Sequence, residues 1–334
     1  MDRDAARAIG RATHGSSDDP EVLDFSANVN PEVPPDTKDA YGGAFGDARS
    51  YPPEPAAGFR EAAAAYVGCE PDGVVPTPGG MAALRLAIAL WVEPGASVIV
   101  PAPSFAEYAR EVRLHGGQPR FVPADELVAT DPADAAMAIA CTPNNPTGAC
   151  YPHDELVAFA GRCRRTGTPL LVDEAFLDFT DRPSMAGHDR VIVARSLTKM
   201  FGLPGLRAGY AVATGETLAA LAGARPPWNV GVPALAVGEH CLEQHEFVTR
   251  TRERVTRERR RMRERLVDGY DVAPSAAPFL LVRAPDVDAL LDRAAGAGIA
   301  IRDARTFRGL ESHVRVAVRR PVENDRMLAE VFDV

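Results

Sequence analysis

Lysine is almost absent from this chain of 334 residues. Among its 37 lysine and arginine residues only Lys38 and Lys199 are lysines, so the other 35 are arginines. Chemistry that needs a side-chain primary amine, such as Schiff-base formation, is therefore restricted to two positions, because a guanidinium cannot replace the amine. Lys38 lies in the polar segment PPDTKDAY, which is typical of a surface position, and this leaves Lys199 as the candidate reactive amine.

Cysteine is scarce and scattered. The five cysteines form no Cys-x-x-Cys pair and lie near no cluster of histidines; they are Cys69, Cys141, Cys150, Cys163 and Cys241. This usage argues against a zinc site and against a disulfide framework. We therefore expect no metal and a reducing compartment, the cytoplasm.

The chain also lacks a long hydrophobic run and an excess of basic charge. Its longest uncharged stretch, Ala135 to His153, is interrupted by prolines and asparagines, and residues 1–10 carry four charges. We therefore expect neither a signal peptide nor a membrane-spanning helix. The net charge of -9 disfavours nucleic acid as a partner, because nucleic-acid binders usually have a basic balance.

Short apolar runs dominate the first two thirds of the chain. Between Tyr51 and Val230 such runs begin at positions 96, 135, 169, 190 and 208, and helix-like segments such as 154–166 separate them. Runs of this length, bounded by proline or glycine, predict buried parallel strands of an α/β sheet. In such sheets ligands bind beyond the carboxyl ends of the strands, so the loops after these runs are the candidate functional segments.

The last third has a different pattern. Segment 239–267 combines nine arginines with interleaved glutamates, and Val248, Val255 and Met262 recur every seven residues, which predicts one long charged helix. Further apolar runs and a helix over 287–297 follow. We therefore predict a large α/β domain with a mostly parallel sheet over 41–238. A smaller α/β domain is predicted from 1–40 and 239–334.

Two glycine- and asparagine-containing loops are candidate ligand sites. In TPGGMAAL, residues 77–84, two glycines precede a run of helix formers. Exposed backbone N–H groups at a helix N-terminus can bind an anion, although a plain turn also explains this segment. In CTPNNPTG, residues 141–148, Asn145 follows a predicted strand, where it either forms a turn or directs its amide at a cofactor ring.

Two further segments carry charged candidates. Asp173 ends the hydrophobic run of LVDEAFLDF, and a buried carboxylate there needs a partner such as a protonated pyridine nitrogen, unless it caps a helix. In RSLTKMFGLPGLRAGY, residues 195–210, Ser196 and Arg207 flank Lys199. A hydroxyl group and a guanidinium are suited to bind a phosphate monoester.

Together these four segments resemble the fold-type-I pyridoxal-phosphate aminotransferases, in particular the histidinol-phosphate aminotransferase group. The resemblance implies that Lys199 carries pyridoxal 5'-phosphate as a Schiff base, that Asp173 pairs with the pyridine nitrogen, and that Asn145 bonds the ring oxygen. It also implies that Phe105 stacks on the ring and that a homodimer shares its sites. The residues implied to bind the cofactor phosphate are Gly80, Met81, Ser196, Arg207 and, from the neighbouring subunit, Tyr51.

Within that group the chain looks most like the L-threonine-O-3-phosphate decarboxylases of cobalamin biosynthesis. The segments THGSS, LDFSANVNP and IRDARTFRGLESHVRVAVR carry this resemblance, as does Phe176, where the aminotransferases usually have tyrosine. The resemblance implies that five residues contact a small phosphorylated amino acid: His14, Gly15, Asn28, Arg302 and Arg315. Two alternatives remain, a histidinol-phosphate aminotransferase that transfers the amino group to 2-oxoglutarate and a catalytically silent, cofactor-binding regulator.

Overall fold

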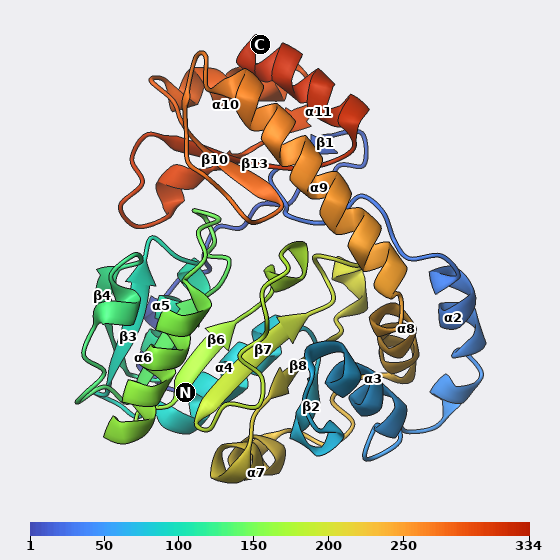
Figure 1. Cartoon of the computed structure of the whole chain (residues 1–334), viewed down its shortest axis with the longest axis vertical. Helices are drawn as coiled ribbons and strands as arrows, with labels where there is room; N and C mark the ends of the chain where they lie inside the picture. Colours follow the sequence, from blue (N-terminus) through green and yellow to red (C-terminus); the bar gives the residue numbers. More distant parts are fainter.

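The largest of the three sheets lies at the centre of the molecule and has seven strands. The computed structural model describes the whole chain, residues 1–334, and Figure 1 shows this sheet in its lower half. Its strands are β2 (Val74–Thr77), β3 (Ser97–Ala102), β4 (Gln118–Pro123), β5 (Met137–Cys141), β6 (Leu170–Asp173), β7 (Val191–Ser196) and β8 (Gly209–Val212). They lie in the order β2-β8-β7-β6-β5-β3-β4. Every residue of β5 and β6 is buried, which explains their uninterrupted apolar sequences.

Helices cover both faces of this sheet. One apolar cluster joins alternate strand residues, such as Leu171, to α4 (Gly80–Trp91), α5 (Ala106–Leu114) and α7 (Gly215–Ala224). The other joins the intervening residues, such as Leu170 and Val172, to α3 (Ala57–Val67), α6 (His153–Thr166) and α8 (Val232–Leu242). Because side chains alternate along a strand, each strand contributes to both clusters. The expected α/β class with a mostly parallel sheet is confirmed.

Strand β8 departs from the parallel arrangement that we expected for all the apolar runs. It pairs antiparallel with both β7 and β2. The segment between Ser196 and Gly209 contains only the short 3₁₀ helix Pro204–Leu206 and no crossover helix. A parallel connection needs such a crossover, so the chain instead re-enters the sheet from the edge at which β7 ends.

A smaller antiparallel sheet lies above the carboxyl ends of the large sheet in Figure 1. In the order β12-β13-β10-β9 it contains β9 (Asp271–Val272), β10 (Phe279–Arg283), β12 (Arg302–Asp303) and β13 (His313–Ala317). Helices α10 (Val287–Gly296) and α11 (Pro321–Met327) flank it, and β11 (Ile299–Ala300) pairs in parallel with β1 (Leu23–Asp24). The domain boundaries at 40 and 238 stay a prediction.

The predicted single helix over 239–267 is wrong at its amino-terminal end. Helix α8 ends at Leu242, and α9 (His245–Leu266) begins after Gln244, whose φ of -84° and ψ of 57° lie outside the helical region. Apolar residues of α8 such as Cys241 are buried in the core of the large sheet, whereas α9 runs up one side of the molecule (Figure 1). The two helices are therefore oriented by different packing surfaces. The predicted apolar stripe of Val248, Val255 and Met262 is buried, as expected.

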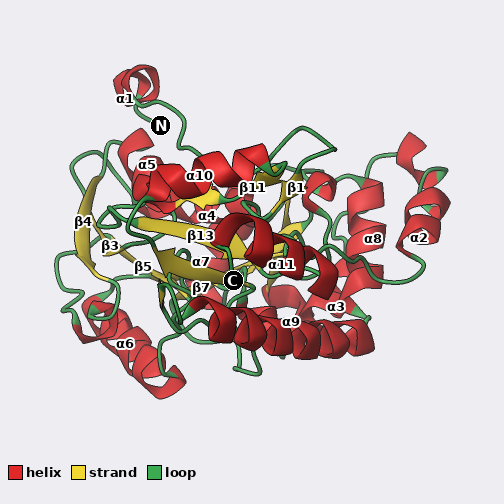
Figure 2. Cartoon of the chain, turned by 90° about the horizontal axis from the view of Figure 1, so that it is seen from above, coloured by secondary structure: helices red, strands yellow, loops and turns green.

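The amino-terminal arm crosses from one sheet to the other. Helix α1 (Arg3–Ala8) lies beside α5, as Figure 2 shows, and the backbone N–H of Asp2 donates to the carbonyl of Leu114 at 2.7 Å. Farther along, the backbone carbonyl of Phe25 accepts from the N–H of Ala317 at 2.9 Å, and α2 (Thr37–Gly43) packs on α8. No helix is long and apolar enough to cross a membrane.

Candidate active site

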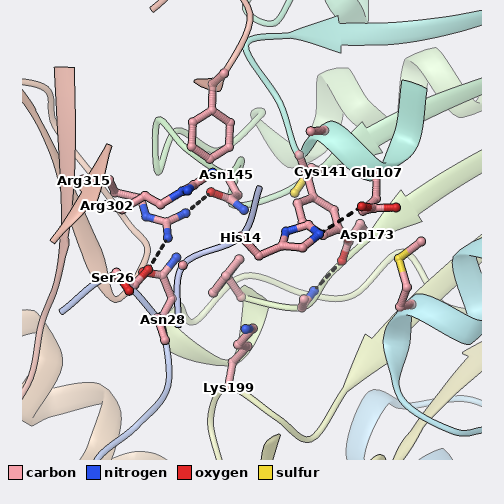
Figure 3. Close-up of a pocket in the computed structure, with 18 of the residues that line it drawn as sticks. His14, Ser26, Asn28, Glu107, Cys141, Asn145, Asp173, Lys199, Arg302 and Arg315 are labelled. Carbon is pink, nitrogen blue, oxygen red and sulfur yellow. Dashed lines mark hydrogen bonds and ion pairs between the residues drawn. The ribbon is translucent and has the colours of Figure 1, made fainter. Parts of the chain in front are cut away.

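A cavity of about 410 Å³ lies between the large sheet and the small antiparallel sheet, at the carboxyl ends of the parallel strands (Figure 3). Asp173 reaches it from the end of β6, and Lys199 reaches it from the loop between β7 and β8. The small sheet contributes to the same cavity. The residues predicted from the sequence that line it are His14, Gly15, Asn28, Met81, Phe105, Asn145, Asp173, Phe176, Lys199, Arg207, Arg302 and Arg315.

Asp173 is a buried carboxylate held by two hydrogen-bond donors. Its Oδ2 accepts from the hydroxyl of Tyr108 at 2.6 Å, and its Oδ1 accepts from the backbone N–H of Ala175 at 3.0 Å. Burial raises the pKa of Asp173 although both bonds oppose that shift. No helix begins at this position, so capping does not explain the residue. The carboxylate is arranged to gain from a cationic partner in the cavity.

Lys199 lies beside Phe176, with Nζ 5.9 Å from the centroid of the ring. Burial lowers the pKa of Lys199 to about 8, and the positive charges of Arg315 and Arg207 lower it as well, whereas Asp173 opposes the shift. Near neutral pH a sizeable fraction of the amine is thus unprotonated. This fraction is nucleophilic, as Schiff-base formation requires.

This shift predicts the pH dependence of Lys199 reactivity. Because its pKa is lowered to about 8, the amine loses its proton, and becomes nucleophilic, as the pH rises through that value. In cofactor-free protein, acylation at Lys199 should follow a curve with its midpoint near pH 8, more than two units below the roughly 10.4 of a lysine peptide. Peptide mass spectrometry after brief labelling measures this curve, and Lys38→Arg simplifies the digest. A midpoint at or above that of the lysine peptide would contradict the buried geometry.

The amino-terminus of α4 forms a cradle for an anion. Gly79 has φ of +85°, and a Cβ there would lie 2.5 Å from Nη2 of Arg207. A Cβ at Gly80 would lie 3.0 Å from the Cβ of Ser196. The positive φ favours glycine at position 79, and the small size of both residues leaves the first backbone N–H groups of the helix close to a guanidinium and a hydroxyl. The two glycines thus do more than form a plain turn.

Two arginines of the small sheet lie side by side on neighbouring strands in one wall of the cavity (Figure 3). Arg302 of β12 is in register with Arg315 of β13, and their exposed fractions are 7% and 4%. Neither has a carboxylate partner. Arg302 donates to the carbonyl of Thr13 at 2.6 Å, and Arg315 donates to the carbonyl of Ser26 at 2.8 Å and to Oδ1 of Asn145.

The nearest negative charges, Asp303 for Arg302 and Asp24 for Arg315, act on this arginine pair only at a distance and form no ion pair with it. Burial, together with the positive charge of the neighbouring Arg302, lowers the pKa of Arg315 to about 9, and the charge of Asp24 opposes this shift. Both guanidinium groups lie over the ring of Phe307, with Cζ 5.5 Å and 5.8 Å from its centroid. The Nε of Arg315 and the Oδ1 of Asn28 are buried and have no hydrogen-bond partner. Two like charges on opposed strands with unsatisfied polar atoms indicate a site for an anionic ligand.

His14 brings the amino-terminal arm to the mouth of the cavity. Its Nε2 lies 2.9 Å from Oε1 of the buried Glu107, and its ring centroid lies 5.6 Å from that of Phe105. The neighbouring Gly15 approaches the backbone carbonyl of Ser26 so closely that a Cβ would collide with it. The arm therefore lies along one side of the cavity.

Tyr51 is the predicted site residue that lies away from the cavity. Its side chain is exposed and stacks on Trp228, with 4.5 Å between ring centroids. Its predicted contact with the phosphate of a neighbouring subunit stays a prediction. Gly80 and Ser196 do not line the cavity themselves but pack against each other beside Arg207 and Gly79.

Tyr108, Glu107 and Phe307 are among the cavity residues that were not predicted from the sequence. Tyr108 lies three residues after Phe105, the N-cap of α5, and so on the same side of this helix, and Glu107 also lines the cavity. Phe307 follows a 3₁₀ helix, Ala304–Thr306, whose position after β12 is set by the small sheet. A helical periodicity argument applied to α5 would have found Tyr108.

Together these residues fit pyridoxal phosphate. The cradle at Gly79 and Gly80 suits its phosphate, the buried carboxylate of Asp173 suits a protonated ring nitrogen, and Lys199 supplies the only amine in the cavity. Phe105 offers an aromatic face. The unpartnered Nε of Arg315 remains for a second anionic group.

Comparison with known proteins gives a consistent result. The family model described as aminotransferase class I and II matches residues 20–332. A protein of Caldanaerobacter subterraneus subsp. tengcongensis, provisionally named a threonine-phosphate decarboxylase, is 32% identical over 325 residues, which cover 89% of this chain and 86% of the relative. The structure of L-threonine-O-3-phosphate decarboxylase from Porphyromonas gingivalis has a TM-score of 0.84 at 25% identity, covering 93% of this chain and 99% of that one.

A similar fold also occurs with a different named activity. Histidinol-phosphate aminotransferase from Sinorhizobium meliloti, solved in complex with pyridoxal-5'-phosphate, has a TM-score of 0.83 at 26% identity. The match covers 92% of this chain and 89% of that structure.

Proposed function

Because this chain belongs to the aminotransferase class I and II family and is a pyridoxal-phosphate enzyme, we propose that it decarboxylates L-threonine O-3-phosphate to (R)-1-aminopropan-2-yl phosphate, for cobalamin biosynthesis. The observation that carries this proposal is the pair of buried arginines, Arg302 and Arg315, in a cavity that is also lined by a phenylalanine at position 176. Similarity to a protein provisionally named a threonine-phosphate decarboxylase and to a solved decarboxylase supports it.

In this proposal each cofactor group has one partner in the chain. Bound pyridoxal phosphate acts as an electron sink for the bond that breaks at Cα of the substrate. Lys199 holds the cofactor through its amine, and Asp173 keeps the ring nitrogen protonated. Asn145 accepts from Arg315 through Oδ1, which leaves its Nδ2 to donate to the ring oxygen, and Phe105 covers one face. The proposed phosphate ligands are Gly80, Met81, Ser196, Arg207 and, in a homodimer, the partner subunit's Tyr51.

The substrate is oriented by the small sheet and the arm. Arg302 and Arg315 bind the phosphate and the carboxylate of the substrate. The remaining walls around the substrate come from Asn28, His14 and Gly15. By holding the substrate at both ends, Arg302 and Arg315 would set the orientation of its Cα bonds, and in this proposal that orientation favours loss of carbon dioxide over loss of the Cα proton. In this proposal the chain has two domains, with the cavity between them. One domain comprises residues 41–238, and the other comprises residues 1–40 and 239–334. The scattered free cysteines support a cytoplasmic location.

A histidinol-phosphate aminotransferase is the second candidate. The similar fold of the Sinorhizobium meliloti enzyme favours it, and the residues around the cofactor would serve both reactions. Phe176 distinguishes the two. It is 4% exposed and packs edge-on against Phe279, with 5.2 Å between centroids, so no hydroxyl group reaches the cofactor from this position. A silent regulator is disfavoured by the intact Lys199 and Asp173.

We predict that this enzyme releases carbon dioxide from L-threonine phosphate and forms little or no glutamate from histidinol phosphate with 2-oxoglutarate. The reason is that two arginine clamps would fix the orientation of a short substrate so that its carboxylate is the group released. Both reactions should be assayed on the same preparation, the first by carbon dioxide release and the second by coupled glutamate detection. Glutamate from histidinol phosphate, without carbon dioxide from threonine phosphate, would establish the second candidate instead.

A further inference from the structure

A second, smaller cavity adjoins the mouth of the first. It has a volume of about 130 Å³ and shares Phe105, Ala106 and Thr306 with the active-site cavity. Two arginines line it. Arg113 comes from the last turn of α5, and Arg308 comes from the loop after the 3₁₀ helix Ala304–Thr306. We call these two arginines, with Phe121 of β4, the vestibule.

The two vestibule arginines share one aromatic ring. The Cζ of Arg308 lies 4.0 Å from the centroid of Phe121, and the Cζ of Arg113 lies 5.8 Å from it. Stacking of this kind fixes the plane of a guanidinium group and leaves its N–H edges available to a ligand. Neither guanidinium forms an ion pair or a hydrogen bond with another residue, so those donors remain unused.

The carboxylates nearest to the vestibule in sequence form ion pairs with other arginines. Arg305, in the 3₁₀ helix just before Arg308, forms ion pairs with Asp288 and Asp303. On α5, one turn from Arg113, Arg110 forms ion pairs with Glu107 and Glu111. Arg113 and Arg308 therefore have no ion-pair partner of their own, beside a site that already contains two arginines.

We propose that the vestibule is an anion-capture site that takes the phosphate group of a phosphate monoester before the ligand reaches Arg302 and Arg315. This inference rests on the proposed function only in that the ligand is a phosphorylated amine. A chain with a net charge of -9 repels a dianion at long range, so a local positive entrance is needed for fast association. Charges at the rim of a binding site act mainly on the association rate and on its salt dependence.

The test is the rate of association of O-phospho-L-threonine and of histidinol phosphate with the holoenzyme, followed by stopped-flow through the cofactor absorption. The double variant Arg113→Gln/Arg308→Gln should lower the association rate constant of both esters by about 3- to 10-fold at low ionic strength. The difference should largely disappear at roughly 0.5 M salt, where charges are screened within a few ångströms. Arg113→Gln alone, which leaves the closer stack on Phe121 intact, should give a smaller decrease of the same kind.

Matched controls separate the vestibule from net charge. The double variant Arg257→Gln/Arg260→Gln removes two charges from the exposed face of α9 and should associate with both esters at the wild-type rate. L-Threonine, which lacks the phosphate, should associate equally with all variants. Equal association rates of the esters in the vestibule and α9 double variants would overturn the proposal.

The same experiment separates this proposal from the proposed function. Vestibule-dependent association without release of carbon dioxide would reject the decarboxylase and keep the capture site. Release of carbon dioxide, together with association rates that do not depend on Arg113 and Arg308, would keep the decarboxylase and reject the capture site. If neither ester changes the cofactor spectrum of the wild type, both proposals are overturned.

Discussion

Replacing Lys199 by alanine will lower the turnover of threonine phosphate by about 10⁴-fold or more. It will also remove the visible absorption of the cofactor at about 420 nm. The amine of Lys199 is the only primary amine of a side chain in the cavity. The other lysine, Lys38, lies on α2 and does not line it, and arginine cannot form the covalent link. No residue is therefore available to replace the lost nucleophile.

Two control variants separate the amine from its charge. Lys199→Arg keeps a cation of similar length but supplies no primary amine, so it should lose the absorption band as completely as the alanine variant does. Lys38→Arg should keep both the band and the rate. Absorption and borohydride reduction followed by mass spectrometry measure the covalent link directly. A reducible adduct and a normal rate in the alanine variant would refute the role of Lys199.

Strand positions follow from the sequence more readily than strand directions do. The apolar runs at positions 135, 169 and 190 became β5, β6 and β7, because short buried runs between helices have few other ways to pack. The direction of β8 depends on the length and course of the loop from Ser196 to Gly209, which periodicity does not describe. The separation of β11 from β12 likewise depends on pairing with β1, almost 280 residues away in sequence.

The site was predictable where the sheet itself assembles it. Asp173 and Asn145 follow neighbouring parallel strands, so their positions at one edge follow from topology alone. The contacts that tune these residues were not predictable in this way. The hydrogen bond between Tyr108 and Asp173 joins residues 65 positions apart, and that between His14 and Glu107 joins residues 93 positions apart. Each requires knowledge of how α5 packs on the sheet and of how the arm packs on α5.

Asp173→Asn should lower the decarboxylation rate by about three orders of magnitude, roughly 4 kcal/mol of transition-state stabilisation, while the cofactor stays bound. Asparagine keeps the shape of the side chain. Its Oδ1 can still accept from the N–H of Ala175, and the hydroxyl of Tyr108 can rotate to accept from the new Nδ2. What is lost is the negative charge, which in our proposal keeps the ring nitrogen of the cofactor protonated.

The companion variant Tyr108→Phe leaves the carboxylate but removes its 2.6 Å hydrogen bond. Because that bond lowers the pKa of Asp173 against the effect of burial, its loss should raise this pKa further and move the acid limb of the rate profile to higher pH. The maximal rate should fall by about 10-fold or less, since a single hydrogen bond contributes on the order of 1 kcal/mol. Single-turnover rates across pH, with cofactor content measured for each variant, test both expectations. A cofactor-loaded Asp173→Asn enzyme with the wild-type rate would show that the carboxylate serves only to position Tyr108 and the turn at Ala175.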